Sequence, residues 1–295
     1  MKQEKNCYFN TASWFFRILW LIASILLFSA SARAESNARP LRIGLPQSIF
    51  DHEFALLVDW QQYLQSKLHR QVEFVYNNKF SDSIEQLHMG KLDYAWVTDY
   101  PNTMVGYHAR LLAVPLYKGK PFITSYLIVP ASDTQTTTFL QLKGKVLAMA
   151  DPTSNSHIER SYELLLARED PRRFFRKVFY TPSHHASVES VILGLANATE
   201  VDNFAWDGMV KDHPELRQLM RIVTQTHEFG APPLVANHFV SKKDFAYMQS
   251  VLIGMAKDPE GLKLLKRMNF DGFISGKAKF YERLVQMKKA LSEER

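Results

Sequence analysis

The chain after residue 40 alternates short apolar stretches with segments whose apolar residues recur at helical spacing. The first strand pattern, LRIGL, ends at Gly44 and Pro46, and a later helix pattern stops at Gly90. Strand, helix, strand, helix, strand within about sixty residues implies right-handed crossovers and a parallel sheet. The predicted elements are a strand at 41–45, a helix at 53–68, a strand at 72–76, a helix at 81–89 and a strand at 92–97.

The same alternation restarts at residue 125. Pro232 and Pro233 then open a third section that is mostly helical. The predicted elements of the second set are strands at 125–129, 145–149 and 177–180, helices at 158–167 and 187–196, and a strand ending from Val201 onward. Those of the third are a strand at 235–240 and helices at 245–256, 260–268 and 279–291.

Two α/β sets joined near residue 125 predict two lobes with a ligand cleft between them. We expect residues 35–124 to form the first part of one lobe and residues 125–230 to form the second lobe. Residues 231–295 should return to the first lobe and add C-terminal helices. Open α/β sheets bind ligands beyond the carboxyl ends of their strands, so the strand-to-helix junctions are the candidate sites.

The first 34 residues have the pattern of a secretory signal peptide. Lys2, Lys5 and Arg17 precede an apolar run over residues 18–28, and Ala32-Arg33-Ala34 fits the A-x-A cleavage pattern. The run of about 11 residues is shorter than the ~20 that a membrane-spanning helix needs. We therefore expect residues 1–34 to direct export to the periplasm, with an uncleaved anchor as the alternative.

Removal of that segment changes what composition implies. It takes four of the 36 basic residues, one of the 30 acidic residues and the sole cysteine, Cys7, and it leaves 261 residues of net charge +3. A mild and scattered positive charge does not favour nucleic acid and is compatible with a small anionic ligand. A mature chain without cysteine excludes disulfides, cysteine nucleophiles and cysteine-ligated metal.

The junction after the strand at 145–149 carries the most informative polar residues. Asp151-Pro152-Thr153-Ser154-Asn155-Ser156-His157 leads directly into the predicted helix. Unpaired N–H groups at a helix N-terminus, together with hydroxyl and amide side chains, make a site for an oxyanion. The structural alternative is a capping box, with Ser156 as N-cap and Glu159 three residues later.

Other junctions add candidate ligand contacts. His184 and His185 follow the strand that ends at Tyr180, and adjacent histidines seldom chelate one metal ion, so we expect hydrogen bonding rather than metal. In the segment 201–207 (VDNFAWD), the alternation predicts a strand, with Asp207 as a ligand carboxylate or a helix N-cap. At the end of the first lobe's third strand, Trp96, Thr98 and Asp99 could face the cleft, with the core as the alternative for Trp96. Phe80 is either core or cleft wall, and Ser125 lies at the lobe crossing.

These junctions together resemble the PhnD-like phosphonate/phosphite-type solute-binding proteins of ABC importers, which have a two-lobed type II periplasmic binding protein fold. The resemblance is carried by the opening LRIGL strand, by GKLDYAW at 90–96, by Leu142-Lys143-Gly144-Lys145 with the Asp151-Pro152-x-Ser-x-Ser loop, by the His184 turn and by VDNFAW. It implies oxyanion contacts from Ser154, Asn155, Ser156 and His184, and an acidic residue facing the ligand at Asp207, where a carboxylate could receive a ligand amine or hydroxyl.

Several positions depart from the family pattern. His157 stands where a glycine is common, Asn155 replaces a central threonine, Phe80 lacks a tyrosine hydroxyl, and Ile123 replaces an aromatic near the Thr124-Ser125 crossing. The ligand is therefore less defined than the fold. The His157 side chain either adds a hydrogen-bond donor or narrows the approach to the site by its bulk.

The resemblance implies a non-catalytic monomer without a cofactor that captures a small phosphonate- or phosphate-like anion for an inner-membrane permease. The alternative is a sensing subunit that docks on a membrane kinase or cyclase. No Ser-His-Asp order or metal motif indicates an enzyme.

Overall fold

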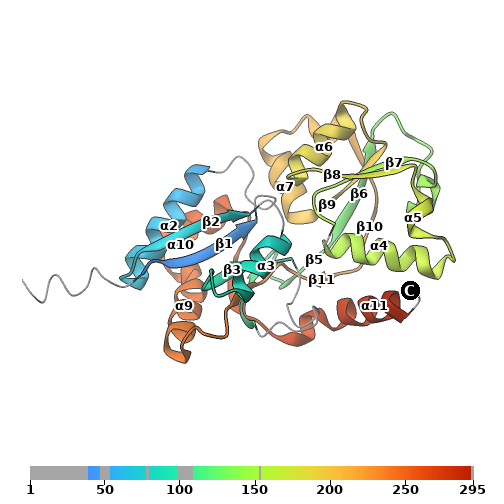
Figure 1. The fold of residues 1–295 in the computed structure, drawn as a ribbon. Helices are drawn as coiled ribbons and strands as arrows, with labels where there is room; N and C mark the ends of the chain where they lie inside the picture. Colours follow the sequence, from blue (N-terminus) through green and yellow to red (C-terminus); the bar gives the residue numbers. More distant parts are fainter. Residues whose placement is uncertain (1–38, 47–53, 78–79, 99–108, 153, 294–295) are drawn as a thin grey trace, which may run out of the picture. The chain divides into compact units, whose positions relative to one another are not determined.

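The computed structural model describes residues 39–46, 54–77, 80–98, 109–152 and 154–293 (Figure 1). The predicted signal peptide, residues 1–34, lies outside these described residues. Residues 41–295 form one compact unit. Across the part of the chain described, no helix combines the length and apolar character needed to cross a bilayer.

The first lobe is built on a six-stranded mixed sheet with the order β13-β4-β12-β3-β1-β2. Strands β1, β2 and β3 are parallel, as predicted, whereas β12 runs antiparallel to β3 and β4, and β13 antiparallel to β4. The strands are β1 (Leu41–Pro46), β2 (Val72–Asn77), β3 (Tyr94–Trp96), β4 (Arg110–Leu116), β12 (Leu234–Ala236) and β13 (Gly272–Ser275).

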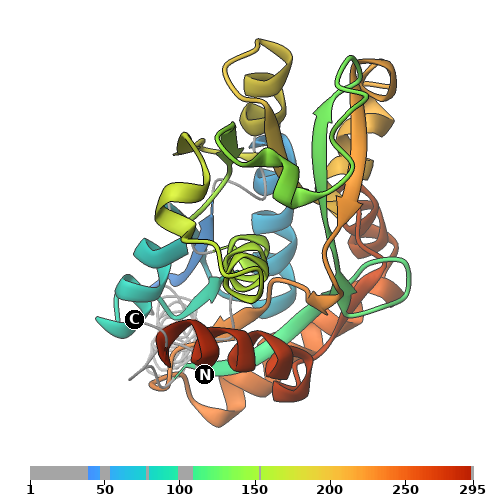
Figure 2. The same cartoon turned by 90° about the vertical axis from the view of Figure 1, so that its right-hand side faces the viewer.

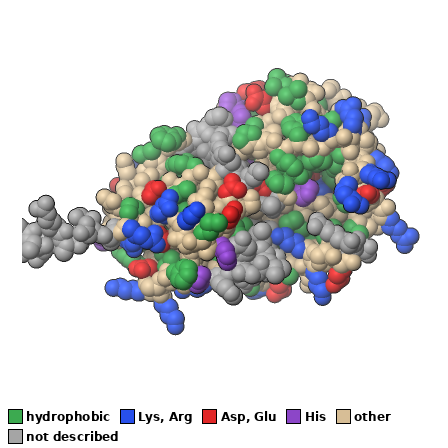
Figure 3. Space-filling model, in the orientation of Figure 1, with side chains coloured by type: hydrophobic (Ala, Val, Ile, Leu, Met, Phe, Trp, Pro, Cys, Tyr) green, Lys and Arg blue, Asp and Glu red, His purple; other side chains and the backbone are tan. Residues whose placement is uncertain are grey.

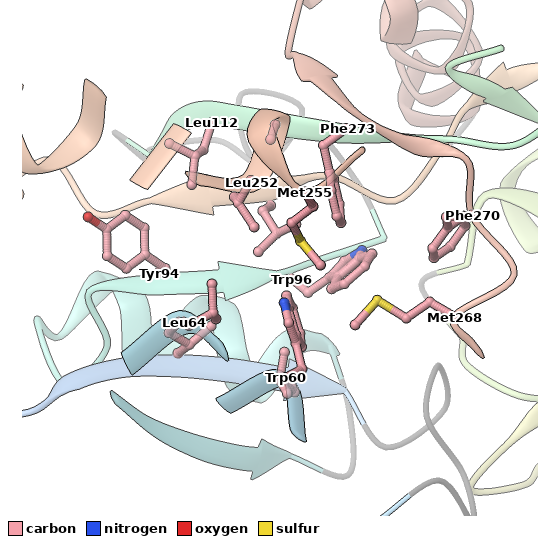
Figure 4. Packing of buried hydrophobic residues seen from close by; sticks show 14 of the residues in the cluster. Trp60, Leu64, Tyr94, Trp96, Leu112, Leu252, Met255, Met268, Phe270 and Phe273 are labelled. Carbon is pink, nitrogen blue, oxygen red and sulfur yellow. The ribbon is translucent and has the colours of Figure 1, made fainter. Parts of the chain in front are cut away.

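Helices cover both faces of this sheet. One face packs against α2, α9 and α10, and its core contains Trp60 and Trp96 with ring centroids 5.7 Å apart (Figure 4). Helix α3 covers the other face through Ile84 and Leu87. The helices are α2 (Phe54–Leu68), α3 (Phe80–His88), α9 (Lys242–Gly254), the 3₁₀ turn η5 (Met255–Lys257) and α10 (Pro259–Arg267).

The second lobe has a five-stranded sheet with the order β10-β6-β9-β7-β8. Strand β7 is parallel to both β8 and β9, and β6 runs antiparallel to β9 and β10. Its elements are β6 (Ser125–Pro130), η4 (Phe139–Leu142), β7 (Val146–Met149), α4 (Asn155–Leu166), α5 (Pro171–Phe174), β8 (Lys177–Tyr180), α6 (His184–Ile192), β9 (Ala198–Asp202), α7 (Asn203–Asp212), α8 (Leu216–Leu219) and β10 (Met220–Gln225).

Short strands and the C-terminal helix join the two lobes. Strands β5 (Phe122–Ile123) and β11 (Phe229–Gly230) pair antiparallel at the crossings between the sheets. After β13, η6 (Ala278–Tyr281) leads into α11 (Glu282–Glu293), which packs along α4 of the second lobe (Figure 2). Three segments of chain therefore pass between the sheets.

The structure corrects several sequence predictions. Helices α4 and α6 each begin three residues before the predicted starts at 158 and 187. The segment VDNFAW is a strand only as far as Asp202, because α7 begins at Asn203. The strand predicted at 235–240 is confined to β12, and the pattern missed β4, β10 and β13.

Candidate functional site

Three strand-to-helix junctions lie along one edge of the second sheet. Strands β9, β7 and β8 are adjacent and parallel, so their carboxyl ends share that edge. They continue into α7, α4 and α6 respectively. Leu164 of α4 packs on one face of the sheet, while Val188 of α6 and Val210 of α7 pack on the other. The edge beyond β7 is therefore the point where successive helices change faces, which is the preferred ligand site of open α/β sheets.

The first turn of α4 is capped by Ser154 rather than by Ser156. The Ser154 Oγ accepts a hydrogen bond from the His157 backbone N–H at 3.3 Å and lies 3.1 Å from the Ser156 Oγ. The predicted capping box is therefore wrong. Its second member, Glu159, instead accepts hydrogen bonds from the backbone N–H and the Nδ1 of His227. Ser156 is buried inside the first turn, beside the cap.

Asn155 is the first residue of α4 and only 4% of its surface is exposed. Its Nδ2 faces the Gly230 carbonyl oxygen, at 3.5 Å, in the crossing strand β11. Its Oδ1 is buried and has no hydrogen-bond partner. This side chain therefore links α4 to a lobe crossing and leaves one acceptor unsatisfied.

His157 follows in the same turn and is partly buried. Burial lowers the pKa of its imidazole, and the nearby Asp151 carboxylate opposes that shift. Its ring meets Tyr180, at the end of β8, edge-on with centroids 6.3 Å apart. His157 thus brings an imidazole with a lowered pKa to the same junction as Ser154.

His184 opens α6 and faces Asp202 at the end of β9. The His184 Nε2 lies 3.5 Å from the Asp202 Oδ2, and the Ser125 Oγ donates to the Asp202 Oδ1. The His184 Nδ1 is buried and has no partner. Two predicted site residues, Ser125 of β6 and His184 of α6, therefore meet at the Asp202 carboxylate at the end of β9.

Asp202 ends β9 at this edge, and Asp151 follows β7 there, whereas the family resemblance indicates Asp207. Asp207 lies inside α7, so it is neither a strand residue nor an N-cap. Its carboxylate accepts hydrogen bonds from the Tyr117 hydroxyl and, at 2.7 Å, from the Lys118 Nζ. The pKa of the Tyr117 hydroxyl is raised, mainly by burial and secondly by its hydrogen bond to Asp207. Asp207 therefore contacts residues of the first lobe's β4–β5 connection.

One unpartnered polar atom belongs to the first residue of each of the three helices. These atoms are the Asn155 Oδ1 in α4, the His184 Nδ1 in α6 and the Asn203 Oδ1 in α7. Buried polar groups are almost always hydrogen-bonded, and an exception needs an explanation. Three such exceptions at three neighbouring helix N-termini indicate a place for a polar ligand.

The first-lobe candidates take different positions. Thr98 is buried directly after β3, and Phe80 is the first residue of α3. Trp96 belongs to the core, because it is fully buried and its Nε1 donates a hydrogen bond to the Pro232 carbonyl oxygen at 2.8 Å. Asp99 lies outside the described residues.

Metal ligands among the described residues, and surface charge on the face drawn in Figure 3, indicate no second site. Within the described ranges, no group of three or more His, Cys, Asp and Glu side chains is arranged to hold a metal ion. On the face drawn in Figure 3, basic and acidic side chains are interspersed over the surface. The edge of the second sheet where β7, β8 and β9 lead into their helices is therefore the candidate functional site.

The two sheets with their crossing strands are those of a type II periplasmic binding protein. The family model for the periplasmic phosphonate substrate-binding protein of ABC transporters matches residues 51–281. The chain belongs to this family of periplasmic substrate-binding proteins.

Solved structures show the same fold at low sequence identity. A binding protein component of an ABC phosphonate transporter from Pseudomonas aeruginosa has a TM-score of 0.75 at 16% identity, over 86% of this chain and 88% of that chain. PhnD1 from Prochlorococcus marinus, in complex with methylphosphonate, has a TM-score of 0.74 at 16% identity, over 86% and 98%. The aliphatic sulphonate-binding protein SsuA from Escherichia coli has a TM-score of 0.61 at 15% identity, over 88% and 94%. No curated protein matches the sequence.

Proposed function

We propose that this protein captures a small phosphonate- or phosphate-like oxyanion in the periplasm and presents it to an inner-membrane ABC permease. The observation that carries the proposal is the N-terminus of α4, where the hydroxyls of Ser154 and Ser156 lie 3.1 Å apart beside the free backbone N–H groups of the first turn. The methylphosphonate complex of the PhnD1 relative supports the choice of ligand class. We further propose export by the signal peptide at 1–34, a monomeric state, and binding without catalysis.

The proposed site combines donors from the α4 N-terminus with groups from the neighbouring junctions. Backbone N–H groups in the first turn of α4 and the hydroxyls of Ser154 and Ser156 would donate to the oxyanion. His184 adds a ring nitrogen that has no other partner. The lobes would close over the anion, because closure removes it from water and strengthens each of these hydrogen bonds.

A thermal-shift screen tests this function directly. Phosphate, phosphite, alkylphosphonates, sulfonates and carboxylates are each added to the purified full-length protein. Ligand at ~100 Kd stabilises the folded state by about 2.7 kcal/mol, which corresponds to a rise in Tm of roughly 5–10 °C for a chain of this size. The combined change Ser154→Ala with Ser156→Ala should abolish the rise given by the best anion, because it removes both hydroxyls and the helix cap.

A matched control separates loss of the site from loss of a cap. Ser241 caps α9 in the first lobe, and Ser250 is exposed on the same helix. Ser241→Ala with Ser250→Ala should lower the Tm of the free protein and keep the full anion-induced rise. The proposed function is wrong if no anion raises the Tm. The proposed site is wrong if the Ser154/Ser156 variant responds like the parent protein.

A further inference from the structure

The hydrogen-bonding polarity of Asn155 restricts which oxyanion the site can take. An amide side chain has one end that donates and one that accepts. The Nδ2 faces the Gly230 carbonyl oxygen at 3.5 Å, and the reversed orientation would bring two acceptor oxygens together there. The Oδ1 is therefore the atom left for the ligand. It is buried, it has no partner, and it belongs to the first residue of α4.

Further acceptors lie at the neighbouring junction. The Asn203 Oδ1 is also buried without a partner at the start of α7. Asp202, one residue earlier, makes no capping bond, and its carboxylate already accepts a hydrogen bond from the Ser125 Oγ and lies 3.5 Å from the His184 Nε2. The neighbouring helix starts therefore offer donors at the α4 N-terminus and unpartnered acceptors on Asn155 and Asn203. An oxyanion without a proton satisfies only the donors.

We infer that the bound ligand carries an acidic proton on its anionic group, so that the site accepts a hydrogen phosphonate or hydrogen phosphate and rejects sulfonates and sulfate. This inference rests on the proposed function. A phosphonate monoanion has a P–OH group that can donate to the Asn155 Oδ1, while its remaining oxygens accept from the α4 N-terminus. A sulfonate has the same shape and charge but no proton. Leaving a buried acceptor unpaired against such a ligand is costly, and sites built around a ligand hydroxyl reject analogues that lack it.

Titratable groups around the junctions make a pH series unsuitable as the main test. Asp151, His157 and Tyr180 surround the first turn of α4, while His184 and Asp202 face each other at the next junctions. Glu159 of α4 also lies near His227 and the α11 residue Arg283. The decisive comparison is therefore between two ligands at one neutral pH, where these groups are in the same state for both.

Isothermal titration of the full-length protein with methylphosphonate and methanesulfonate provides that comparison. Methylphosphonate should bind at least ~100-fold more tightly, as expected when a buried acceptor is left unpaired in one complex only. Equal affinities for the two anions would overturn the inference and leave the proposed function intact. Failure of every anion would overturn the proposed function itself, and the inference with it.

Variants of Asn155 show whether this residue sets the preference. A threonine hydroxyl can donate or accept, so Asn155→Thr should raise the affinity for methanesulfonate by about tenfold. Asn155→Asp keeps an acceptor at the position and should preserve the rejection of methanesulfonate. The Tm of each free variant checks that it folds. A threonine variant that folds but gains no sulfonate affinity would contradict the role of Asn155.

A second ligand pair locates the proton. 2-Aminoethylphosphonate and taurine carry the same ammonium group on different anionic groups. Taurine should bind as poorly as methanesulfonate. If taurine instead binds as tightly as 2-aminoethylphosphonate, the donor is the ammonium group, and the inference of a proton on the anionic group is wrong.

Discussion

Asp202 and Asp207 show how a helix boundary decides which carboxylate faces the candidate site. Five residues separate them, which is almost one and a half turns of α7. Asp202 ends β9 and meets Ser125 and His184, whereas Asp207 contacts Tyr117 and Lys118. The alternation in VDNFAW predicts a strand that would carry Asp207 to the sheet edge. The helix begins at Asn203 instead, so Asp202 ends the strand and Asp207 lies inside α7.

Affinity measurements on the two aspartates should separate their roles. Asp202→Asn should weaken methylphosphonate binding by roughly 10–100-fold, because the partly buried acceptor that holds His184 and Ser125 is weakened and reoriented. Asp207→Asn keeps the hydrogen bond from Tyr117 and should change affinity by less than about threefold at a half-exposed ion pair. Isothermal titration of both variants gives the comparison. A larger loss for Asp207→Asn would return the ligand carboxylate to that position.

The predicted starts of α4 and α6 each lie three residues after the observed ones, and both differences have the same cause. Apolar spacing reports only residues that face the core, and the first turns, Asn155–His157 and His184–Ala186, are largely polar. The residues that form the candidate site are therefore the ones that apolar spacing cannot place on a helix. The junctions themselves could still be located, because each directly follows a strongly apolar or alternating strand.

Strands β4 and β13 of the first sheet, and the antiparallel pairing of the predicted strand β12, were the other part that sequence patterns missed. Strand β12 pairs with β3 through Leu234 and Trp96, which are far apart along the chain. In β4, Pro115 lies opposite Phe273, although a proline argues against a strand inside a sheet. Local patterns contain no information on such distant pairing. The parallel strand-helix units, whose partners are close in sequence, were predicted correctly.

A buried ion pair holds α4 against β9 beneath the candidate site. The Arg160 Nε lies 2.7 Å from the Glu200 Oε1, and the Arg160 side chain also contacts Glu163 and the ring of Phe139. Burial raises the pKa of Glu200 to about 7, and Arg160 opposes that rise. Helix α4 carries Ser154 and Asn155, so this pair helps to fix the position of the proposed oxyanion site relative to Asp202 on β9.

Loss of Arg160 alone should therefore be costly. Arg160→Met leaves Glu200 buried without its partner and should reduce the free energy of unfolding by about 3–5 kcal/mol. Arg160→Met with Glu200→Leu removes both charges and should recover most of that loss. Glu163 is half-exposed, so Glu163→Gln should cost no more than about 1 kcal/mol. Urea unfolding of the three variants tests the pair, and equal losses in the two single variants would contradict it.

At the scale of the molecule, α11 connects the last strand of the first sheet to the helix that carries the candidate site. Leu284 and Met287 pack against Ile158 of α4, and the Arg283 Nη2 lies 3.8 Å from the Glu159 Oε1. Helix α11 therefore packs on the side of α4 that faces away from the second sheet. Residues at the end of the chain should influence binding without touching the ligand.

Leu284 and its neighbour Val285 offer a matched test of this support. Leu284 is 3% exposed and Val285 is 43% exposed on the same helix. Leu284→Ala should reduce the free energy of unfolding by about 2–5 kcal/mol, as for other buried leucines. Val285→Ala should change it by no more than about 0.5 kcal/mol. Comparable losses in urea unfolding would show that α11 does not need its contact with α4.

The strand orders of the two sheets also determine when each can form as the chain emerges. All strands of the second sheet come from one uninterrupted stretch, 125–225, whereas the first sheet places β12 between β3 and β4 and ends with β13 at Gly272–Ser275. The second lobe can therefore complete its sheet while about seventy residues have still to appear. The first lobe must wait with the edges of β3 and β4 unpaired, and such edges readily pair with other chains. The species most prone to aggregate during biogenesis is thus a chain whose second lobe is folded and whose first lobe is incomplete. Aggregation should begin at the first lobe, which is synthesised first and completed last.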